Sequence, residues 1–203
     1  MSPHPYEACL QPLISPNPFY RSSEVLQSFE DSSIKGVYAW WFRNLPSFVP
    51  LYGTRRSNEM ALLYVGTSKR PLRKRLGEHV RHDASRSTLR RSIGCLLAEE
   101  LRIELEVTRV SRVSKCHFGF GLLGEQALSS WMEENARISW VQHTEPLLLE
   151  QYVIDTLTLP VNVRGNNHPF AAQLDILLRE HETRALSKRS ALLGKRGKFE
   201  AAL

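Results

Sequence analysis

Glu150 is the first residue in this 203-residue sequence whose type and position suggest chemistry. At helical spacing it shares a face with four aliphatic residues: Leu147, Val153, Ile154 and Leu157. An ionised carboxylate turned toward apolar neighbours needs a metal ion, an arginine or several hydrogen-bond donors close by. The alternative is a glutamate at the edge of the apolar stripe with its carboxylate in water, which is the commoner situation in proteins.

Arg75 and His79 form a second pair of interest. They lie four residues apart, so they are neighbours on one side of a helix expected over residues 72–80. The apolar face of that helix consists of Leu72, Leu76 and Val80. A cation and an imidazole would therefore lie beside whatever this helix packs against. Taken alone, each is more often an ordinary surface residue.

Two tyrosines stand close to glycines in apolar, strand-like runs. Gly36-Val37-Tyr38 opens the first run and Tyr64-Val65-Gly66 closes the second. Tyrosines in strands usually serve packing, so this pattern gains meaning only from the residues that follow it. Asn162 follows Glu150 by twelve residues and lies just after Pro160, where it is either a positioning residue or a simple turn residue.

In this order and at these spacings, the residues resemble the GIY-YIG nuclease superfamily over residues 36–166. The four-residue step from Arg75 to His79 and the twelve-residue step from Glu150 to Asn162 are similar to those of excision-repair and restriction-enzyme members. Segments 87–94 and 162–166 also resemble an uncharacterised bacterial branch of the family. The sequence departs from the family pattern twice. The 26-residue step between the tyrosines is longer than is usual, and Thr67 stands where repair members often have lysine.

The resemblance implies an α+β fold with a small central antiparallel sheet flanked by helices. It also implies hydrolysis of phosphodiester bonds with Mg²⁺ or Mn²⁺ as cofactor. Glu150 would be the only protein ligand of the metal ion, which Mg²⁺ accepts because it keeps most of its waters. Arg75 would hold a non-bridging phosphate oxygen with its planar fork of donors.

The same resemblance gives the tyrosines their roles. Tyr64, or else Tyr38, would take the proton from the attacking water, with His79 relaying that proton or holding the phenol. A free phenol has a pKa of about 10, so either tyrosine needs a pKa lowered by Arg75 and the metal ion. Asn162 would orient the phosphate or the water shell of the metal. The sequence does not rank the two tyrosines.

The charge pattern points to nucleic acid as the partner. The chain carries 27 Lys and Arg against 21 Asp and Glu, a net charge of +6. Nine of the basic residues, against two acids, lie between Lys69 and Arg91. A solvated helical face is the alternative, but one basic strip on an otherwise acidic chain favours contact with a phosphate backbone. Besides Arg75, the predicted contacts are Lys69, Arg70, Arg73, Lys74, Arg81, Arg86, Arg90 and Arg91.

Hydrophobic patterning predicts the elements that position these residues. We expect a proline-rich amino-terminal arm over 1–33, a catalytic domain over 34–166, and a carboxy-terminal helix with a basic tail over 167–203. Within the domain we expect strands at 36–42, 61–66, 101–110 and 138–143, a loop at 43–59, and helices at 72–80, 87–97, 124–135 and 146–159; the last helix should span 170–186.

Cysteine usage and hydropathy predict a cytoplasmic protein. Cys9, Cys95 and Cys116 are widely spaced and odd in number, which favours reduced thiols over disulfides or a zinc site. No apolar run approaches the roughly 18 residues of a membrane helix. The first residues contain several prolines and no Lys or Arg before Arg21, unlike a secretory signal.

These observations favour a DNA endonuclease. Two alternatives remain open, a nucleic-acid-binding module whose site is inactive and a nuclease that acts on RNA. A single centre cuts one strand, so a double-strand cut would need a homodimer or two successive nicks.

Overall fold

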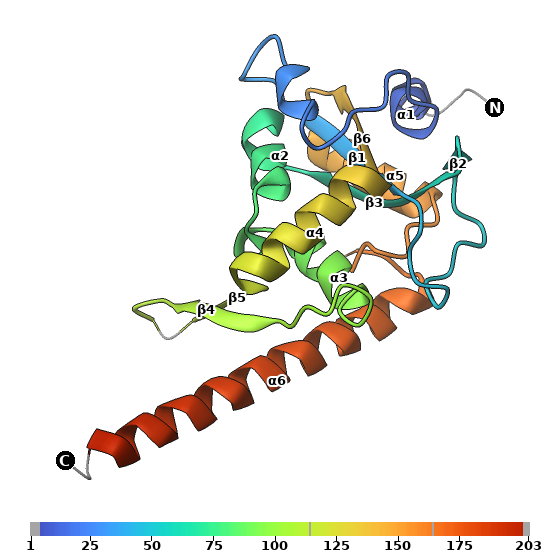
Figure 1. The fold of residues 1–203 in the computed structure, drawn as a ribbon. Helices are drawn as coiled ribbons and strands as arrows, with labels where there is room; N and C mark the ends of the chain where they lie inside the picture. Colours follow the sequence, from blue (N-terminus) through green and yellow to red (C-terminus); the bar gives the residue numbers. More distant parts are fainter. Residues whose placement is uncertain (1–4, 114, 164, 201–203) are drawn as a thin grey trace.

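The structure, a computed structural model, describes residues 5–113, 115–163 and 165–200, with side chains described as far as residue 193. It is an α+β fold (Figure 1). In chain order the elements are α1 (Glu7–Ile14), η1 (Val25–Gln27), β1 (Gly36–Phe42), β2 (Arg56–Ser57), β3 (Met60–Thr67), α2 (Leu72–Val80), η2 (Ala84–Arg86), α3 (Thr88–Leu96), β4 (Glu106–Val110), β5 (Cys116–Gly119), α4 (Gly121–Asn135), β6 (Ala136–Gln142), α5 (Pro146–Thr156) and α6 (Pro169–Glu200).

The main sheet is antiparallel, with strand order β2-β3-β1-β6. Strand β1 is buried along its whole length, which explains why its sequence is apolar at every position. Successive side chains of a strand point to opposite faces, and here each face meets its own core. Tyr38, Trp40 and Phe42 pack into one core, and Val37, Ala39 and Trp41 into the other.

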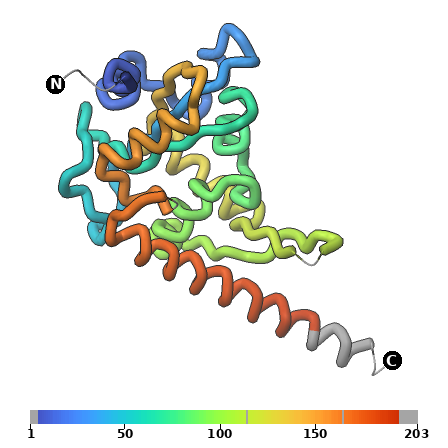
Figure 2. Tube along the Cα trace, turned by 180° about the vertical axis from the view of Figure 1, so that it is seen from behind, coloured from blue at the N-terminus to red at the C-terminus, as the bar shows by residue number. Residues whose placement is uncertain are grey.

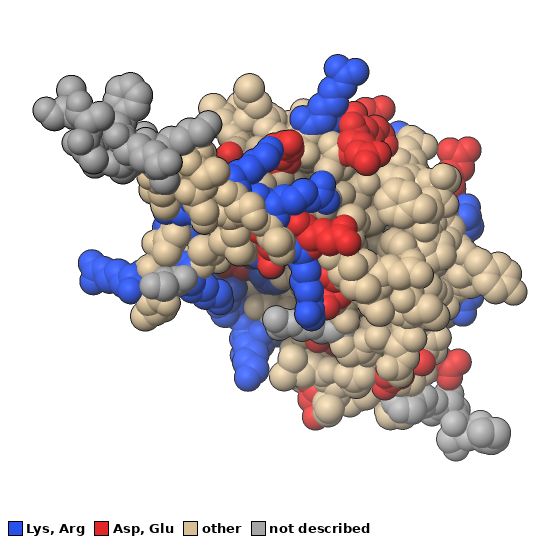
Figure 3. Space-filling model, turned by 90° about the horizontal axis from the view of Figure 1, so that it is seen from below, with Lys and Arg blue, Asp and Glu red and all other residues tan. Residues whose placement is uncertain are grey.

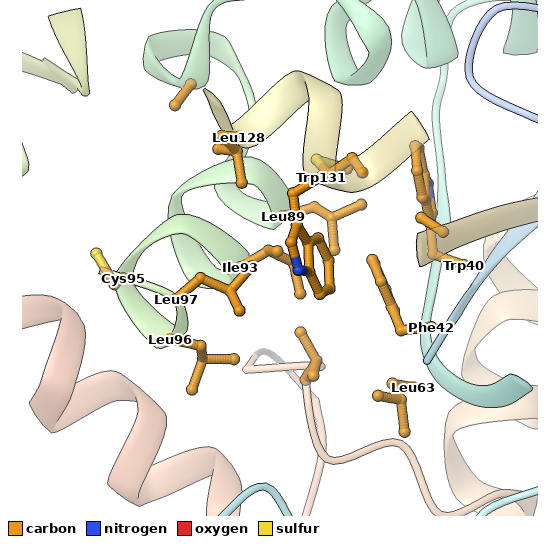
Figure 4. Packing of buried hydrophobic residues seen from close by; sticks show 14 of the residues in the cluster. Trp40, Phe42, Leu63, Leu89, Ile93, Cys95, Leu96, Leu97, Leu128 and Trp131 are labelled. Atoms are coloured by element: carbon orange, nitrogen blue, oxygen red, sulfur yellow. The ribbon is translucent and has the colours of Figure 1, made fainter. Parts of the chain in front are cut away.

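Helices cover both faces of this sheet. Helices α2, α3 and α4 pack on the face of Trp40 and Phe42, where Trp131 and Leu128 of α4 and Ile93 of α3 surround them (Figure 4). Helices α1 and α5 cover the opposite face. The long helix α6 runs across the end of the molecule away from α1 (Figures 1 and 2). Among the described residues, no helix combines the length and hydropathy needed to cross a bilayer.

Two glycines allow the strands to approach closely around Tyr38. A Cβ atom on Gly36 would lie 1.9 Å from the carbonyl oxygen of Val141 on β6. A Cβ atom on Gly66, which is paired with Tyr38 across β1 and β3, would lie 2.5 Å from the Tyr38 hydroxyl. Glycine is therefore required at both positions by the space that the neighbouring strand and phenol occupy.

The amino-terminal segment differs from the extended arm expected from its prolines. Residues 7–14 form helix α1 even though Pro12 lies inside it, because Leu10 and Leu13 are buried against the sheet. Tyr20 then forms an isolated antiparallel bridge with Ile138 of β6. Burial of two leucines thus outweighs the local preference of proline.

Two further expectations are corrected near residues 101–119. The strand expected over 101–110 begins only at Glu106, because Arg102 has a positive φ of 53° that breaks an extended chain. Its partner β5 was not predicted from the sequence. The two form a separate two-stranded hairpin beside the main sheet.

Helix α6 extends further than the sequence pattern indicated. It continues to Glu200 rather than ending at about Leu186. Leu174, Leu178 and Ala185 are buried along its inner side, where it packs against α3 and β4. Of the basic tail expected from Lys188 onward, the side chains from residue 194 lie outside the described part.

Candidate active site

A chain of hydrogen bonds joins Tyr38, His79 and Ser87 in the interior. The Tyr38 hydroxyl lies 2.7 Å from His79 Nε2, and His79 Nδ1 lies 2.6 Å from Ser87 Oγ. His79 and Tyr38 are fully buried. Which atom donates in each bond depends on the ring nitrogen that carries the proton. Burial, together with the charges of Arg75 and Arg90, lowers the pKa of His79 well below 6.5, so the imidazole is neutral at pH 7.

Arg75 links this chain to a carboxylate on the same helix. Its Nε donates to the Tyr38 hydroxyl at 3.3 Å, and its Nη1 donates to Glu78 Oε2 at 2.9 Å. Nη1 also donates to the carbonyl oxygen of Arg86 at 3.4 Å. The guanidinium is thus fixed in orientation while remaining partly exposed to solvent.

Tyr64 lies on the same side of the sheet as Tyr38 but nearer the surface. Its ring centroid is 6.4 Å from that of Tyr38 and 6.5 Å from that of His79. Burial raises the pKa of Tyr64, while Arg75 and the Tyr38 hydroxyl act to lower it. Burial also raises the pKa of Tyr38, to well above its ordinary value. The lowering expected from Arg75 is therefore outweighed by burial in the protein alone.

Glu150 lies beside these groups on α5, half-buried. Burial raises its pKa to about 7, against the lowering effects of a hydrogen bond from the Thr67 backbone and of Arg75. The face that carries it is slightly rotated from the expected one, because Leu149 is buried and Leu147 is 49% exposed. Glu150 therefore lies at the edge of the buried stripe, the alternative position considered for it, rather than on a face shared with Leu147.

Glu150 fits a role as a single-carboxylate ligand for a hard divalent cation. Its carboxylate oxygens are the kind of ligand that such a cation prefers. Burial destabilises the ionised carboxylate, and a bound positive ion would stabilise it again. Among the described residues, no group of three or more His, Cys, Asp or Glu side chains stands close enough to hold a metal by itself. A bound ion would therefore take its remaining ligands from water and substrate.

Asn162 occupies a different position from the one expected. Its Oδ1 accepts from the Val65 amide and its Nδ2 donates to the Val65 carbonyl, both at 2.8 Å. Asn162 is buried, and both ends of its amide are used by β3. It is therefore not free to orient a phosphate or a metal's water shell, and it acts on the site by holding the strand next to Tyr64.

The free edge of β3 explains where Asn162 binds. Strand β2 pairs only with the first two positions of β3, which leaves the outward backbone groups beyond them without a strand partner. The Leu63 carbonyl accepts from the Val161 amide at 3.1 Å, and Asn162 bonds both backbone groups of Val65. Two alternate positions of this edge are thus satisfied by the segment that follows α5.

The predicted basic strip divides between surface and interior. Arg90 is wrong as a nucleic-acid contact, because it is 1% exposed and pairs with Glu125 at 2.7 Å inside the protein. Arg91 is half-buried beside Glu182 of α6. The others are exposed: Lys69, Arg70, Arg73, Lys74, Arg81 and Arg86. Of these, Arg70 pairs with Glu78 and Arg73 donates to the Leu26 carbonyl.

Three residues that sequence reasoning missed support the site. Glu78 orients Arg75, and its position three residues later in the helix is the signal that could have identified it. Ser87 caps α3 through the Arg90 amide while it bonds His79. Glu125 accepts from the amides of Ala84 and Phe120, and it lies at helical spacing from buried Leu128 just as Glu150 does from Val153.

Comparison with known proteins identifies a family. A family model described as the GIY-YIG catalytic domain matches residues 36–184, which include every residue of the site. Searches of curated proteins and of solved structures return no match.

Proposed function

Because the chain belongs to the GIY-YIG catalytic-domain family, we propose that it is a metal-dependent endonuclease that hydrolyses phosphodiester bonds of DNA. The observation that carries this proposal is the convergence of Arg75, Tyr64 and Glu150. Arg75 donates to the Tyr38 hydroxyl, and the Tyr38 ring lies 6.4 Å from that of Tyr64. The charge of Arg75 also lowers the pKa of Glu150, which follows it by 75 residues in the chain.

Arg75 is the group that would bind the scissile phosphate. Glu78 and the Arg86 carbonyl fix its guanidinium from one side, and Tyr38 fixes it from the other. These bonds use Nε and Nη1, so the N–H groups of Nη2 are the donors that would stabilise a non-bridging oxygen as negative charge develops on it.

Tyr64 is the better placed of the two tyrosines to act as general base. Tyr38 has no exposed surface and its hydroxyl already contacts His79 and Arg75, whereas Tyr64 is partly exposed. Tyr64, ionised to the phenolate, would take a proton from the water whose oxygen attacks phosphorus; the bond from phosphorus to the leaving oxygen breaks, and that oxygen takes a proton from solvent water. Tyr38 and His79 then position Arg75 and support the Tyr64 phenolate.

Glu150 would hold the divalent ion, Mg²⁺ or Mn²⁺. When bound, such an ion supplies positive charge to the phosphate and to the leaving oxygen. The ion also favours the ionised form of Glu150, whose pKa burial raises to about 7 in the protein alone. The Thr67 backbone, at the end of β3, and Arg75 also act to lower the pKa of Glu150.

Cleavage of supercoiled plasmid with Mg²⁺ tests the proposal. Wild-type protein should nick the plasmid, and Glu150→Gln should abolish nicking while it keeps DNA binding. Glu145→Gln, at the exposed start of the same helix, is the matched control and should nick normally. Nicking by Glu150→Gln contradicts the metal role. Binding without turnover in any divalent metal supports the inactive module, and preferential cutting of structured RNA supports an RNA nuclease.

A further inference from the structure

A pocket of about 490 Å³ opens next to Arg75, between η2 and β4. It is lined by Glu78, Arg81, Asp83, Ser85, Arg86, Thr108 and Arg109. Two of these residues also contact the Arg75 guanidinium, Glu78 through its carboxylate and Arg86 through its carbonyl. The pocket therefore lies directly beside Arg75, the candidate phosphate-binding residue. A larger cavity of about 870 Å³, beside α6, shares no lining residue with it.

The pocket carries uncompensated positive charge. Glu78 is already paired with Arg70 and Arg75, and Asp83 accepts from the Ser85 amide, so three arginines in the wall stand against one unpaired carboxylate. In the part of the chain that the structure describes, no acid forms an ion pair with the exposed residues Arg81, Arg86 and Arg109. Three guanidinium groups around one hollow, none of them paired with an acid there, favour phosphate oxygens as the ligand.

The hairpin of β4 and β5 extends this charge away from the pocket. Arg109 lies on β4, and Arg112 and Lys115 lie in the turn, which the Ser111 amide closes by donating to the Lys115 carbonyl at 2.8 Å. The base of the hairpin rests on η2 and α6, while Val113 in the turn is 84% exposed. Seen from below, Lys and Arg side chains gather at the left of the molecule, whereas acidic and basic side chains are mixed over its middle (Figure 3).

The shape of the hairpin distinguishes between possible nucleic acids. Two paired strands lie about 4.8 Å apart, and the major groove of B-form DNA, about 12 Å wide, admits such a ribbon. The major groove of A-form RNA is too narrow and deep for side chains to enter. A ribbon beside a phosphate pocket therefore fits a B-form duplex, with one strand in the pocket and the groove over the hairpin.

We propose that the Arg81–Arg86–Arg109 pocket is a phosphate subsite flanking the cleaved bond, and that the β4–β5 hairpin lies in the major groove of double-stranded DNA. This inference rests on the proposed function and makes the duplex its substrate class. The pocket holds the backbone next to the phosphate on Arg75. The hairpin sets the direction in which the duplex leaves the site.

Binding without cleavage tests the subsite. Labelled duplex DNA, its single strand and a duplex RNA of the same sequence are titrated in EDTA at several salt concentrations. The variants are Arg81→Ala/Arg86→Ala/Arg109→Ala in the pocket and Arg112→Ala/Lys115→Ala in the turn. The control Arg21→Ala/Arg56→Ala/Arg179→Ala removes three exposed charges elsewhere, so its net charge matches that of the pocket variant. Circular dichroism checks that all variants are folded.

We expect the pocket variant to bind duplex DNA at least about tenfold more weakly, with its salt slope reduced by about 0.9 for each phosphate that the protein no longer neutralises. The turn variant should weaken duplex binding more than single-strand binding. The control should change neither. Equal losses of affinity in the control and the pocket variant overturn the proposal, because the charge then acts diffusely. Equally tight RNA-duplex binding with the same dependence on these residues overturns the assignment to DNA.

Plasmid nicking by the same proteins separates this inference from the proposed function. If wild-type protein nicks plasmid and the pocket variant binds normally, the subsite is wrong and the endonuclease stands. If the pocket variant loses binding but no protein nicks plasmid in any divalent metal, the endonuclease is wrong and the docking surface stands.

Discussion

Tyr38 and Tyr64 have the same chemistry but different surroundings, and this difference gives a direct test of their roles. Tyr64→Phe removes the proposed base, so kcat should fall by about 10²- to 10⁴-fold while the free energy of unfolding changes little. Tyr38→Phe removes a buried hydroxyl that bonds His79 and Arg75. It should lower stability by about 1–3 kcal/mol as well as the rate, because both partners lose a hydrogen bond.

Plasmid-nicking rates and urea unfolding of the two variants check this assignment. Tyr52→Phe, at a residue 96% exposed, serves as the control and should change neither quantity. A normal rate in Tyr64→Phe would show that another group takes the proton.

His79 makes the stability of the protein depend on pH. In the folded state burial and two arginines hold its pKa well below 6.5. Below about pH 6.5 the unfolded chain therefore binds a proton that the folded chain does not. The His79 contribution to the free energy of unfolding therefore falls with decreasing pH in this window, by up to about 1.4 kcal/mol per pH unit. Glu150, whose folded pKa is about 7, contributes with the opposite sign between about pH 7 and its ordinary pKa of 4.5, because there the folded chain binds the proton. Relative to wild type, His79→Gln should thus gain stability as the pH is lowered below about 6.5, measured by urea unfolding at several pH values. His82→Gln, at an exposed position, should keep the wild-type slope.

At the scale of the elements, helices α2 and α3 each contain a glycine, and the two glycines differ in the space available for a side chain. A Cβ atom on Gly94 of α3 would lie 2.3 Å from two ring atoms of buried Phe120, whereas a Cβ atom on Gly77 of α2 would meet nothing within 4 Å. Gly94→Ala should destabilise by about 1–3 kcal/mol through overpacking. Gly77→Ala should stabilise by about 0.5–1 kcal/mol through helix propensity. Urea unfolding of both variants checks the contrast, and equal effects would contradict the close approach of α3 to Phe120.

Helix α4 supports the site through one buried ion pair. Glu125 bonds Arg90 of α3 and the backbone of η2, so it fixes the segment that ends in Ser87. Glu125→Gln leaves the buried arginine without its counter-charge and should cost about 3–5 kcal/mol in denaturant unfolding. Glu182→Gln breaks only the half-exposed contact with Arg91 and should cost less than about 1 kcal/mol. Similar losses of stability in the two variants would contradict a supporting role for Glu125.

Local sequence patterns predicted most elements but not how distant residues meet. Strands β1 and β3 could be predicted because each is apolar on both faces. Strand β5 has only four residues, too few for a period to show. The burial of Arg90 could not be predicted because its partner Glu125 follows 35 residues later in the chain. The contact of Asn162 depends on β2 being too short to cover β3, which no local pattern reveals.

At the scale of the whole molecule, each chain carries one set of Tyr64, Arg75 and Glu150. We therefore predict that supercoiled plasmid accumulates as the nicked circle before linear DNA forms, with an initial rate proportional to protein concentration. Gel electrophoresis of a time course checks this. Direct formation of linear DNA, with a rate that rises as the square of the concentration, would instead indicate a homodimer that cuts both strands together.

The two hydrogen bonds between Asn162 and Val65 join residues that lie 97 positions apart in the chain, and this separation has a consequence for biosynthesis. The ribosome synthesises the two tyrosines and Arg75 first, whereas Glu150 and Asn162, which bonds β3, are synthesised much later. Under the proposed function, an unfinished polypeptide therefore lacks the metal ligand and poses no hazard to the genome of the cell that is translating it.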